Sequence, residues 1–331
     1  MQDQCEAVDF DYLKDIGLDN PVLGARPIDL NDFVGPEWVA SWLDDLWCEN
    51  YRKNSTYKLK RFAKTWDSRG KAVVFVGASP SVTKHIETLK TLDNNFIIVA
   101  CNTVYARLLQ DGVRVDYIFA VEARPHIAKD FTVQDEHTEL IVSPFVAPEV
   151  LEAWKGKISI YYLGGGKKYA ELLELDGIKD IDIGGGNALN TAVCWAYKYL
   201  SSADFIFIGT SFCYYDQYYF DNRTTDYLCQ FDPKDVKVKA IDIYGSAVNV
   251  TPSQLMYKTW LESFVRYAKD AHFINSTEDG ILGVMPEIVS IEGENVSYTI
   301  KYLPWLHIIP FDLAIKSYRQ LFMEANRNGT R

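Results

Sequence analysis

Small and polar residues follow several apolar segments of the sequence, at the points where strands would end. Hydroxyl, amide and carboxylate groups of this kind can bind phosphates and sugars or hold a metal ion. If the apolar segments end at one edge of a sheet, these residues would lie around a single ligand. The candidates are Gly77, Ser79, Ser81, Asn102, Glu122, Gly209, Ser211 and Asn275.

The first of these segments is Gly-Ala-Ser-Pro-Ser at residues 77–81. Gly77 permits a tight exit from a strand, Ser79 can cap the next helix, and Pro80 suits a first helical turn. We expect free N–H groups and the positive end of the helix dipole to face a phosphate there. An ordinary capped helix start has the same pattern, so both interpretations stay open.

A glycine-rich segment provides a second candidate site at Gly184, Gly185, Gly186 and Asn187. Glycines let the backbone approach a ligand closely, and Asn187 is a favourable N-cap for a helix over 187–200. A second helix N-terminus at the same cleft would suit a diphosphate or an anionic sugar. A glycine loop that serves packing alone is the alternative.

A tyrosine-rich segment forms the third cluster, SFCYYDQYYFDN at 211–222, which includes Tyr214 and Tyr218. Tyrosine hydroxyls donate hydrogen bonds to phosphate oxygens without carrying charge, and the rings can form walls for a sugar or a base. A buried aromatic plug or a partner surface would account for the same composition.

The elements that must position these residues follow from the pattern of apolar runs. Short runs that are apolar throughout predict strands buried on both faces, and helical stretches fall between several of them. Such repetition predicts a doubly wound parallel sheet, which binds ligands beyond the carboxyl ends of its strands. The predicted strands are 72–77, 96–101, 115–122, 139–145, 158–164 and 205–210, and the predicted helices are 82–92, 103–111, 147–154 and 187–200.

We therefore predict an α/β protein with a Rossmann-like, mostly parallel sheet over 71–285. Residues 1–70 are expected to be a helical extension, with an amphipathic helix at EWVASWLDDLW and a basic helical patch at NSTYKLKRFAKTW. An amphipathic helix is predicted over 253–271, followed by a strand from His272. Residues 286–331 are expected to add a hairpin with Gly293 in its turn and a terminal helix.

The bulk composition excludes several classes of protein. A net charge of −11 opposes nucleic-acid binding. No stretch approaches about 20 apolar residues, so no membrane span is expected. The acidic start has no apolar segment, and we expect a cytoplasmic protein. The six cysteines form no C-x-x-C pair, the segment at 77 lacks the second glycine of G-x-G-x-x-G, and GGGKKY at 164–169 lacks the first glycine of a P-loop.

Three sequence blocks resemble the 6-hydroxymethylpterin diphosphokinase MptE-like family, whose domain is also the core of the motility accessory factor glycosyltransferases. They are VVFVGASPSVTKHIETLK, GGGNALNTAVCWAYKYLSSADFIFIGTSF and FINSTEDGILGV, in the order expected for the family. An asparagine-bearing helical segment ending in WDSRGK precedes them, and the resemblance covers roughly residues 50–285.

CNTVYARLL and YYFDN also resemble bacterial sialyltransferases, which share this nucleotide-binding fold. The resemblance implies that Gly77, Ser79, Ser81 and Asn102 contact a nucleotide donor. It further implies that Tyr214 and Tyr218 contact the phosphate of that donor.

Two departures from the family pattern concern possible catalytic groups. The family's Gly-Gln-Asp-Leu-Ala segment is Gly209-Thr210-Ser211-Phe212-Cys213 here, so Ser211 replaces an aspartate. In the third block, Asp279-Gly280 replaces a pair of glycines. Glu122 stands where the family usually has an aspartate after its third strand.

The resemblance implies a transferase, and the preferred form is a glycosyltransferase that uses a nucleotide-activated, CMP-nonulosonate-like sugar. The acceptor would be a small molecule, a glycan or a protein, and His126, Glu122 or His272 would accept its proton. Ser211 is a further catalytic candidate because of its place in the family motif. An ATP-dependent pterin pyrophosphokinase with Mg²⁺, held by Glu122, Asp216 or Asp221, and a non-catalytic nucleotide-binding relative are the alternatives.

Overall fold

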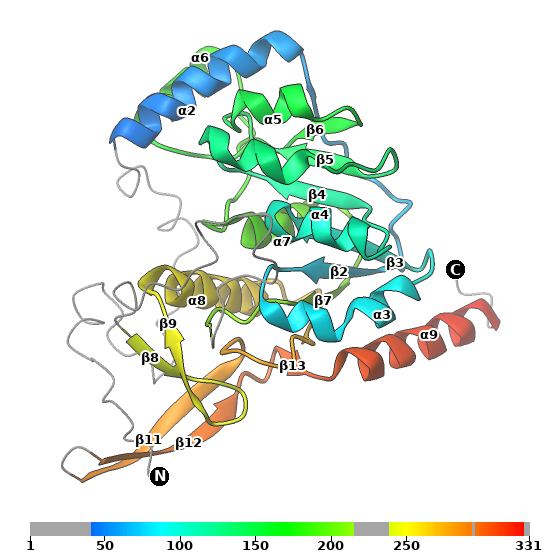
Figure 1. Ribbon diagram of the computed structural model, residues 1–331, viewed down its shortest axis with the longest axis vertical. Helices are drawn as coiled ribbons and strands as arrows, with labels where there is room; N and C mark the ends of the chain where they lie inside the picture. The colour runs from blue at the N-terminus through cyan, green and yellow to red at the C-terminus, as the bar shows by residue number, and fades with distance from the viewer. Residues whose placement is uncertain (1–40, 215–237, 293–294, 328–331) are drawn as a thin grey trace.

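The structure is a computed structural model that describes residues 41–214, 238–292 and 295–327. Its centre is a nine-stranded sheet in which every neighbouring pair is parallel (Figure 1). The strand order is β1-β6-β5-β4-β3-β2-β7-β10-β13. The strands are β1 (Lys60–Arg61), β2 (Ala72–Val76), β3 (Phe96–Cys101), β4 (Tyr117–Ala120), β5 (Glu139–Val142), β6 (Ile158–Ile160), β7 (Asp204–Ile208), β10 (His272–Asn275) and β13 (His307–Ile308).

The central strands form because their residues are apolar on both faces. Every residue of β2, β3 and β5 is buried, which the unbroken apolar runs predicted. Val74 and Val76 of β2 pack into the core on one face, whereas Val73 and Phe75 pack into the core on the other. The sheet is therefore the middle layer of three, and the predicted doubly wound α/β fold is confirmed.

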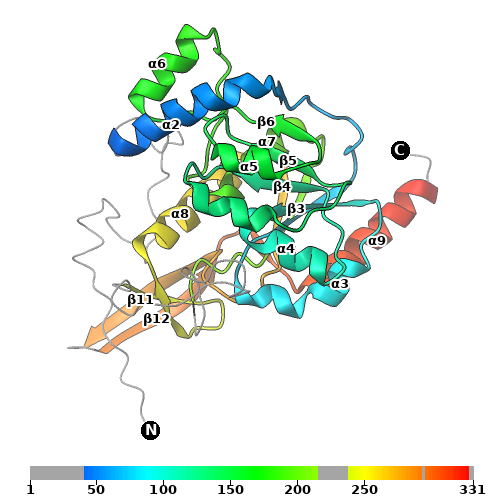
Figure 2. The ribbon, with the colours of Figure 1, turned by 45° about the horizontal axis from the view of Figure 1, so that its top comes forward.

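Helices cover both faces of the sheet (Figure 2). One core contains residues of η4 (Pro80–Lys84), α3 (Ile86–Lys90), α4 (Asn102–Gln110), η5 (Pro125–Phe131), α5 (Pro148–Ala153) and α9 (Phe311–Arg327). The other core contains residues of α2 (Ser41–Asn54), α6 (Lys167–Leu175), α7 (Ala188–Tyr199) and α8 (Pro252–Tyr267). None of the described helices is long and apolar enough to cross a membrane.

The strand order reverses between β2 and β7. The chain builds β2 through β6 in one direction, and then returns so that β7 pairs with the other edge of β2. In open parallel sheets this reversal leaves a crevice at the carboxyl ends of the two strands, where ligands commonly bind. The loops that follow β2 and β7 are consequently expected to border a ligand site.

Smaller elements lie near the β13 end of the sheet (Figure 1). The predicted hairpin is present as β11 (Val284–Glu292) and β12 (Asn295–Tyr302), and its Gly293 lies outside the described residues. A second hairpin, β8 (Val238–Ile241) with β9 (Ala247–Val250), was not predicted. At the opposite end of the sheet, α2 and α6 pack against each other (Figures 1 and 2).

The structure corrects the prediction of a basic helical patch at 54–66. Only Ser55–Tyr57 form a short 3-10 turn, and Lys58 ends it in the left-handed conformation with φ 51°. Residues 60–61 then pair with β6 as a parallel edge strand. Trp38 lies outside the described residues, whereas Trp47 stacks on Phe145 at 4.3 Å between ring centroids.

The contact between Gly77 and Gly209 allows a clear stability prediction. A Cβ at Gly77 would lie 2.2 Å from the carbonyl oxygen of Gly209. We expect Gly77→Ala to lower the free energy of unfolding by about 3 kcal/mol, because rigid backbone must move. Denaturant unfolding would measure the change. The matched control is Gly177→Ala, where a Cβ meets nothing within 4 Å and the left-handed φ of +78° alone costs about 1 kcal/mol. Equal losses in the two variants would contradict the close contact.

Candidate functional site

The loops that follow β2 and β7 meet directly at the switch point. Gly77 N donates to the carbonyl oxygen of Ile208 at 2.9 Å, and Ser79 N donates to that of Gly209 at 3.1 Å. These two amides are therefore not among the free N–H groups of the turn that were predicted to face a phosphate. They continue the pairing of β2 with β7 beyond the strands, so they have no capacity left for a ligand.

The three serine hydroxyls of these loops are also turned toward one another. Ser79 Oγ lies 2.8 Å from Ser81 Oγ and 2.7 Å from Ser211 Oγ. Ser211 also lies within hydrogen-bonding distance of the Asp279 carboxylate, and all four side chains are buried. The loop tips converge as expected, but the hydroxyls of the three serines contact one another and form a polar cluster with Asp279.

The two departures from the family pattern are therefore neighbours in space. Ser211 follows β7, Asp279 follows β10, and Gly280 lies so close to Ser211 that a Cβ would be 2.3 Å from its backbone. Burial raises the pKa of Asp279, and the hydrogen bond from Ser211 partly opposes that shift. A carboxylate is thus present at this tip of the sheet, supplied by the β10 loop.

More accessible polar groups lie at the carboxyl ends of β3 and β4. Asn102 is the first residue of α4 and is half-buried, and its Nδ2 donates to Asp130 Oδ2 at 2.7 Å. Two residues beyond β4, Glu122 accepts from Arg124 at both carboxylate oxygens, at 2.9 and 2.7 Å. Arg124 is exposed, so its guanidinium lies at the surface of this edge.

The surroundings of Glu122 and His126 shift their pKa values for different reasons, and this distinguishes the two candidate bases. Burial alone would raise the pKa of Glu122, but the hydrogen bonds from Arg124 outweigh burial and lower it. Partial burial lowers the pKa of His126, against the opposing effect of the Glu122 charge. A neutral imidazole accepts a proton readily near pH 7, whereas a carboxylate held by a guanidinium does not. His126 is therefore the better base of the two.

The glycine-rich segment lies at the N-terminus of α7. Asn187 caps this helix, with its side chain accepting from Asn190 N at 2.8 Å, as predicted. A Cβ at Gly185 would lie 2.1 Å from that of Asn190, so this glycine is required for packing. Gly185 N donates to Thr191 Oγ1 at 3.2 Å, whereas Gly186 is exposed and has φ 77°. Of these two glycines, Gly186 is the one that stays accessible to a ligand.

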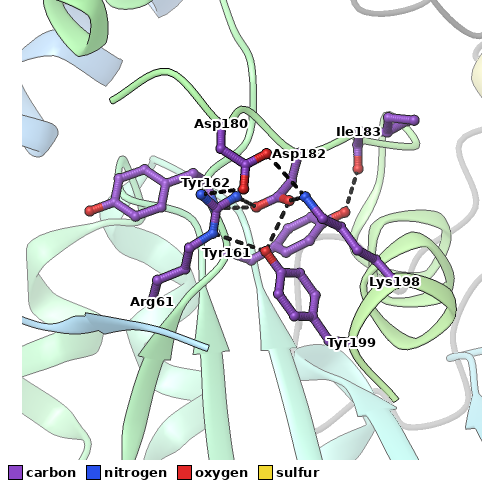
Figure 3. Close-up of polar contacts among 8 residues, drawn as sticks. All are labelled: Arg61, Tyr161, Tyr162, Asp180, Asp182, Ile183, Lys198 and Tyr199. Carbon is purple, nitrogen blue, oxygen red and sulfur yellow. Dashed lines mark hydrogen bonds and ion pairs between the residues drawn. The ribbon is translucent and has the colours of Figure 1, made fainter. Parts of the chain in front are cut away.

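A network of ionic and hydrogen-bonded contacts holds the segment that leads to these glycines (Figure 3). Asp182 is fully buried, and its carboxylate contacts Arg61 Nη2 at 2.5 Å and Lys198 Nζ at 2.6 Å. Tyr199 OH donates to the same carboxylate at 3.1 Å. Asp180 contacts both cations from the solvent side.

This network joins β1, the end of β6 and α7 to the glycine segment. Tyr161, directly after β6, donates through its OH to the carbonyl oxygen of Ile183 at 2.8 Å (Figure 3). Ile183 immediately precedes Gly184. The network therefore sets where the glycine segment begins, and the sequence alone did not indicate it because its members are up to 138 residues apart.

The side chain of Asn275, another predicted donor contact, is engaged within the protein. Asn275 is buried, and its side chain donates to Leu282 O at 3.0 Å and accepts from Thr277 N at 3.0 Å. Tyr214 is buried, and its backbone N–H donates to Asn249 O at 3.0 Å. Tyr218 lies outside the described residues. Asn275 thus shapes the loop after β10, and it does not face the edge as we expected.

The prediction of His272 as a candidate base is wrong, because this residue lies at the other edge of the sheet. It is the first residue of β10, and its Nδ1 lies 3.1 Å from Asp204 Oδ1 at the start of β7. Both residues lie at the amino ends of their strands, opposite the candidate site. The sequence contained this signal, since His272 precedes the apolar residues of its strand.

Two asparagines of α2 were missed as functional candidates. Their side-chain amides donate to carbonyls in the loops after β4 and β5, at distances between 2.8 and 3.1 Å. Asn50 donates to Ala123, next to Glu122, and to Phe145. Asn54 donates to Pro144 and Val146. Asn50 therefore fixes the loop that carries Glu122 and Arg124, and both asparagines fix the loop after β5.

The kinase alternative would require side chains that hold a magnesium ion. Among residues 41–214, 238–292 and 295–327, no group of three or more histidine, cysteine or acidic side chains is placed to hold a metal ion. Glu122, the one predicted ligand in these ranges, is already paired with Arg124. The described residues do not fit a metal, and Asp216 and Asp221 lie outside them.

The three layers, the strand reversal and the polar carboxyl edge define a Rossmann-like α/β protein. The model of one family, described as 6-hydroxymethylpterin diphosphokinase MptE-like, matches residues 46–217, which is more than half of the chain. The protein therefore belongs to this family, as its sequence blocks predicted. No curated protein matches the chain.

A solved structure, a MAf glycosyltransferase from Magnetospirillum magneticum AMB-1, is similar to this protein. The TM-score is 0.57 and the sequence identity is 19%, over 80% of this chain and 38% of that chain. At this identity the likeness shows the fold alone. This chain spans well under half the length of that protein.

The Asp182 network supports a second prediction. We expect Asp182→Asn to lower the free energy of unfolding by about 2 kcal/mol, because two cations lose a fully buried partner but stay partly hydrated. Asp180→Asn is the matched control in the same network, and its side chain is 68% exposed. It should cost less than about 0.5 kcal/mol. Similar values for both variants, measured by urea unfolding, would refute a central role for Asp182.

Asp130 allows a pH-dependent prediction. Burial raises the pKa of Asp130 from its ordinary value of 3.8 to about 6, so the folded protein binds a proton more tightly than the unfolded chain. Stability contributed by this group is therefore gained as the pH falls through 6. Between pH 7 and pH 5, the wild type should gain about 1 kcal/mol of unfolding free energy relative to Asp130→Asn. A constant difference between the two proteins across this range would contradict the prediction.

Proposed function

We propose that this protein is a transferase that takes a nucleotide-activated sugar, of the CMP-nonulosonate type, as its donor. The observation that carries the proposal is the juxtaposition of Asn102, the Glu122–Arg124 pair and His126 at two neighbouring strand ends. An amide, an exposed guanidinium and a neutral imidazole are the groups needed for a base or ribose, a phosphate and a proton. Family membership and the fold agree with this proposal.

In the proposed reaction, an acceptor hydroxyl attacks the anomeric carbon of the sugar. The bond between that carbon and the phosphate oxygen breaks, and the nucleotide monophosphate leaves with the electron pair. His126 accepts the proton of the hydroxyl, and Arg124 stabilises the charge on the leaving phosphate. Glu122 holds Arg124 in place through two hydrogen bonds. Gly186, at the N-terminus of α7, adds backbone that a phosphate or a sugar carboxylate can approach.

The second candidate is an ATP-dependent diphosphotransferase acting on a pterin alcohol, and the description of the family favours it. Its phosphate chemistry would call on Mg²⁺ supplied with the nucleotide. A relative that binds a nucleotide without catalysis is the third candidate. The first two candidates differ in nucleotide and in metal requirement, so binding measurements separate them. Release of CMP from a CMP-sugar separates the first candidate from the third.

The decisive experiment is a thermal-shift and calorimetric panel of CMP, CTP, ATP and GTP, with and without Mg²⁺. We expect CMP and CTP to bind without metal, and a CMP-sugar to release CMP when an acceptor is present. Binding of ATP that requires Mg²⁺ would support the diphosphotransferase instead. If no nucleotide binds the full chain, the proposal is wrong.

The position of the site is tested by Asn102→Ala. Loss of one hydrogen bond should weaken nucleotide binding about tenfold with little change in melting temperature. Asn94→Ala is the matched control, because Asn94 precedes β3 at the opposite edge and contacts Arg114. Equal affinities for the two variants would place the nucleotide elsewhere.

A further inference from the structure

The contact between Asn102 and Asp130 restricts what Asn102 can recognise. Asp130 belongs to η5 and Asn102 begins α4, and these two elements pack against each other. The Asp130 side chain is buried, with 2% of the residue exposed, and Asn102 Nδ2 lies 2.7 Å from its Oδ2. An ionised carboxylate only accepts hydrogen bonds, so the amide must turn its NH₂ group toward Asp130.

With its NH₂ group held, the Asn102 carboxamide presents its oxygen on the other side. None of the residues within 41–214, 238–292 and 295–327 donates a hydrogen bond to this Oδ1 atom, and Asn102 is only half-buried. An amide oxygen accepts and cannot donate. A ligand group that pairs with it must therefore carry an N–H or an O–H.

Asp130 destabilises the fold at this position. Its Oδ1 is buried and has no hydrogen-bond partner among the described residues. Lys129 is adjacent in the chain and acts on it only through charge. A buried carboxylate with one unpaired oxygen destabilises the fold relative to an apolar residue of similar size. Such costs are commonly retained where a side chain must orient a functional group.

We propose that Asp130 is a positioning residue that holds Asn102 as a hydrogen-bond acceptor, and that the site therefore selects a nucleotide group that donates. This inference rests on the proposed nucleotide site. The donating group is either the exocyclic amino group of a cytosine or adenine base, or a ribose hydroxyl. Uracil and hypoxanthine present a carbonyl oxygen at the corresponding position, and two acceptors do not pair.

The test compares nucleotide pairs that differ in one donor, by calorimetry at pH 8. If the amino group is recognised, the wild type should bind CMP about tenfold more tightly than UMP, and AMP more tightly than IMP. If a ribose hydroxyl is recognised, 2′-deoxy-CMP or 3′-deoxy-CMP should lose a similar factor while CMP and UMP bind alike.

Two variants then distinguish a loss of the Asn102 orientation from a general loss of structure at the site. In Asp130→Leu the amide is free to rotate, so the preference should fall below about twofold. Asp130→Asn keeps an acceptor for Asn102 Nδ2 and should retain most of the preference. A merely structural role would weaken both members of a pair equally and leave their ratio unchanged. If Asp130→Leu binds nucleotides with the same preference as the wild type, this inference is wrong, whereas the proposed function is unaffected. Failure of the wild type to bind any nucleotide would overturn the proposed function, and this inference with it.

Discussion

The backbone contact between Gly77 and Gly209 is the constraint on which the arrangement of the carboxyl edge depends. Only hydrogen at the Gly77 Cα permits the loop after β7 to approach so closely. The amides of the β2 loop then pair with β7, and three serines and Asp279 fill the space beyond them. Because the described parts of these two loops close on each other in this way, the accessible polar groups among the described candidate residues lie one and two strands away, at β3 and β4.

The proposed site is supported by residues that contact no ligand themselves. Asn50 and Asn54 of α2 hold the loops after β4 and β5, and Asp182 holds the start of the glycine segment. Each support uses charged or amide groups buried against backbone or against an opposite charge. Such contacts have strict geometry, and this is the property needed to keep Asn102, Arg124 and His126 in fixed relation.

The fold was predictable because its signal is local. Unbroken apolar runs such as 72–77 and 96–101 predict buried parallel strands, and the residues at their ends follow from strand direction. The contacts among Ser79, Ser211 and Asp279 were not predictable, because a sequence does not show which loops meet. The same limit hid Asp130, whose importance comes from one hydrogen bond across 28 residues. His272 is a different case. It precedes the apolar residues of its strand, so strand direction alone already places it at the amino edge of the sheet, away from the site.

The amides of α2 also bear on where an autonomously folding fragment can begin. A fragment that starts at β2 would contain the whole run from β2 to β6, but it would lack Asn50 and Asn54. Four carbonyls, those of Ala123, Pro144, Phe145 and Val146, would then lose their donors. Water can replace these donors once the helix is gone, so each lost hydrogen bond costs about 1 kcal/mol net. The four together are a substantial fraction of the stability of a typical domain, and a fragment that includes α2 is expected to be the more stable one.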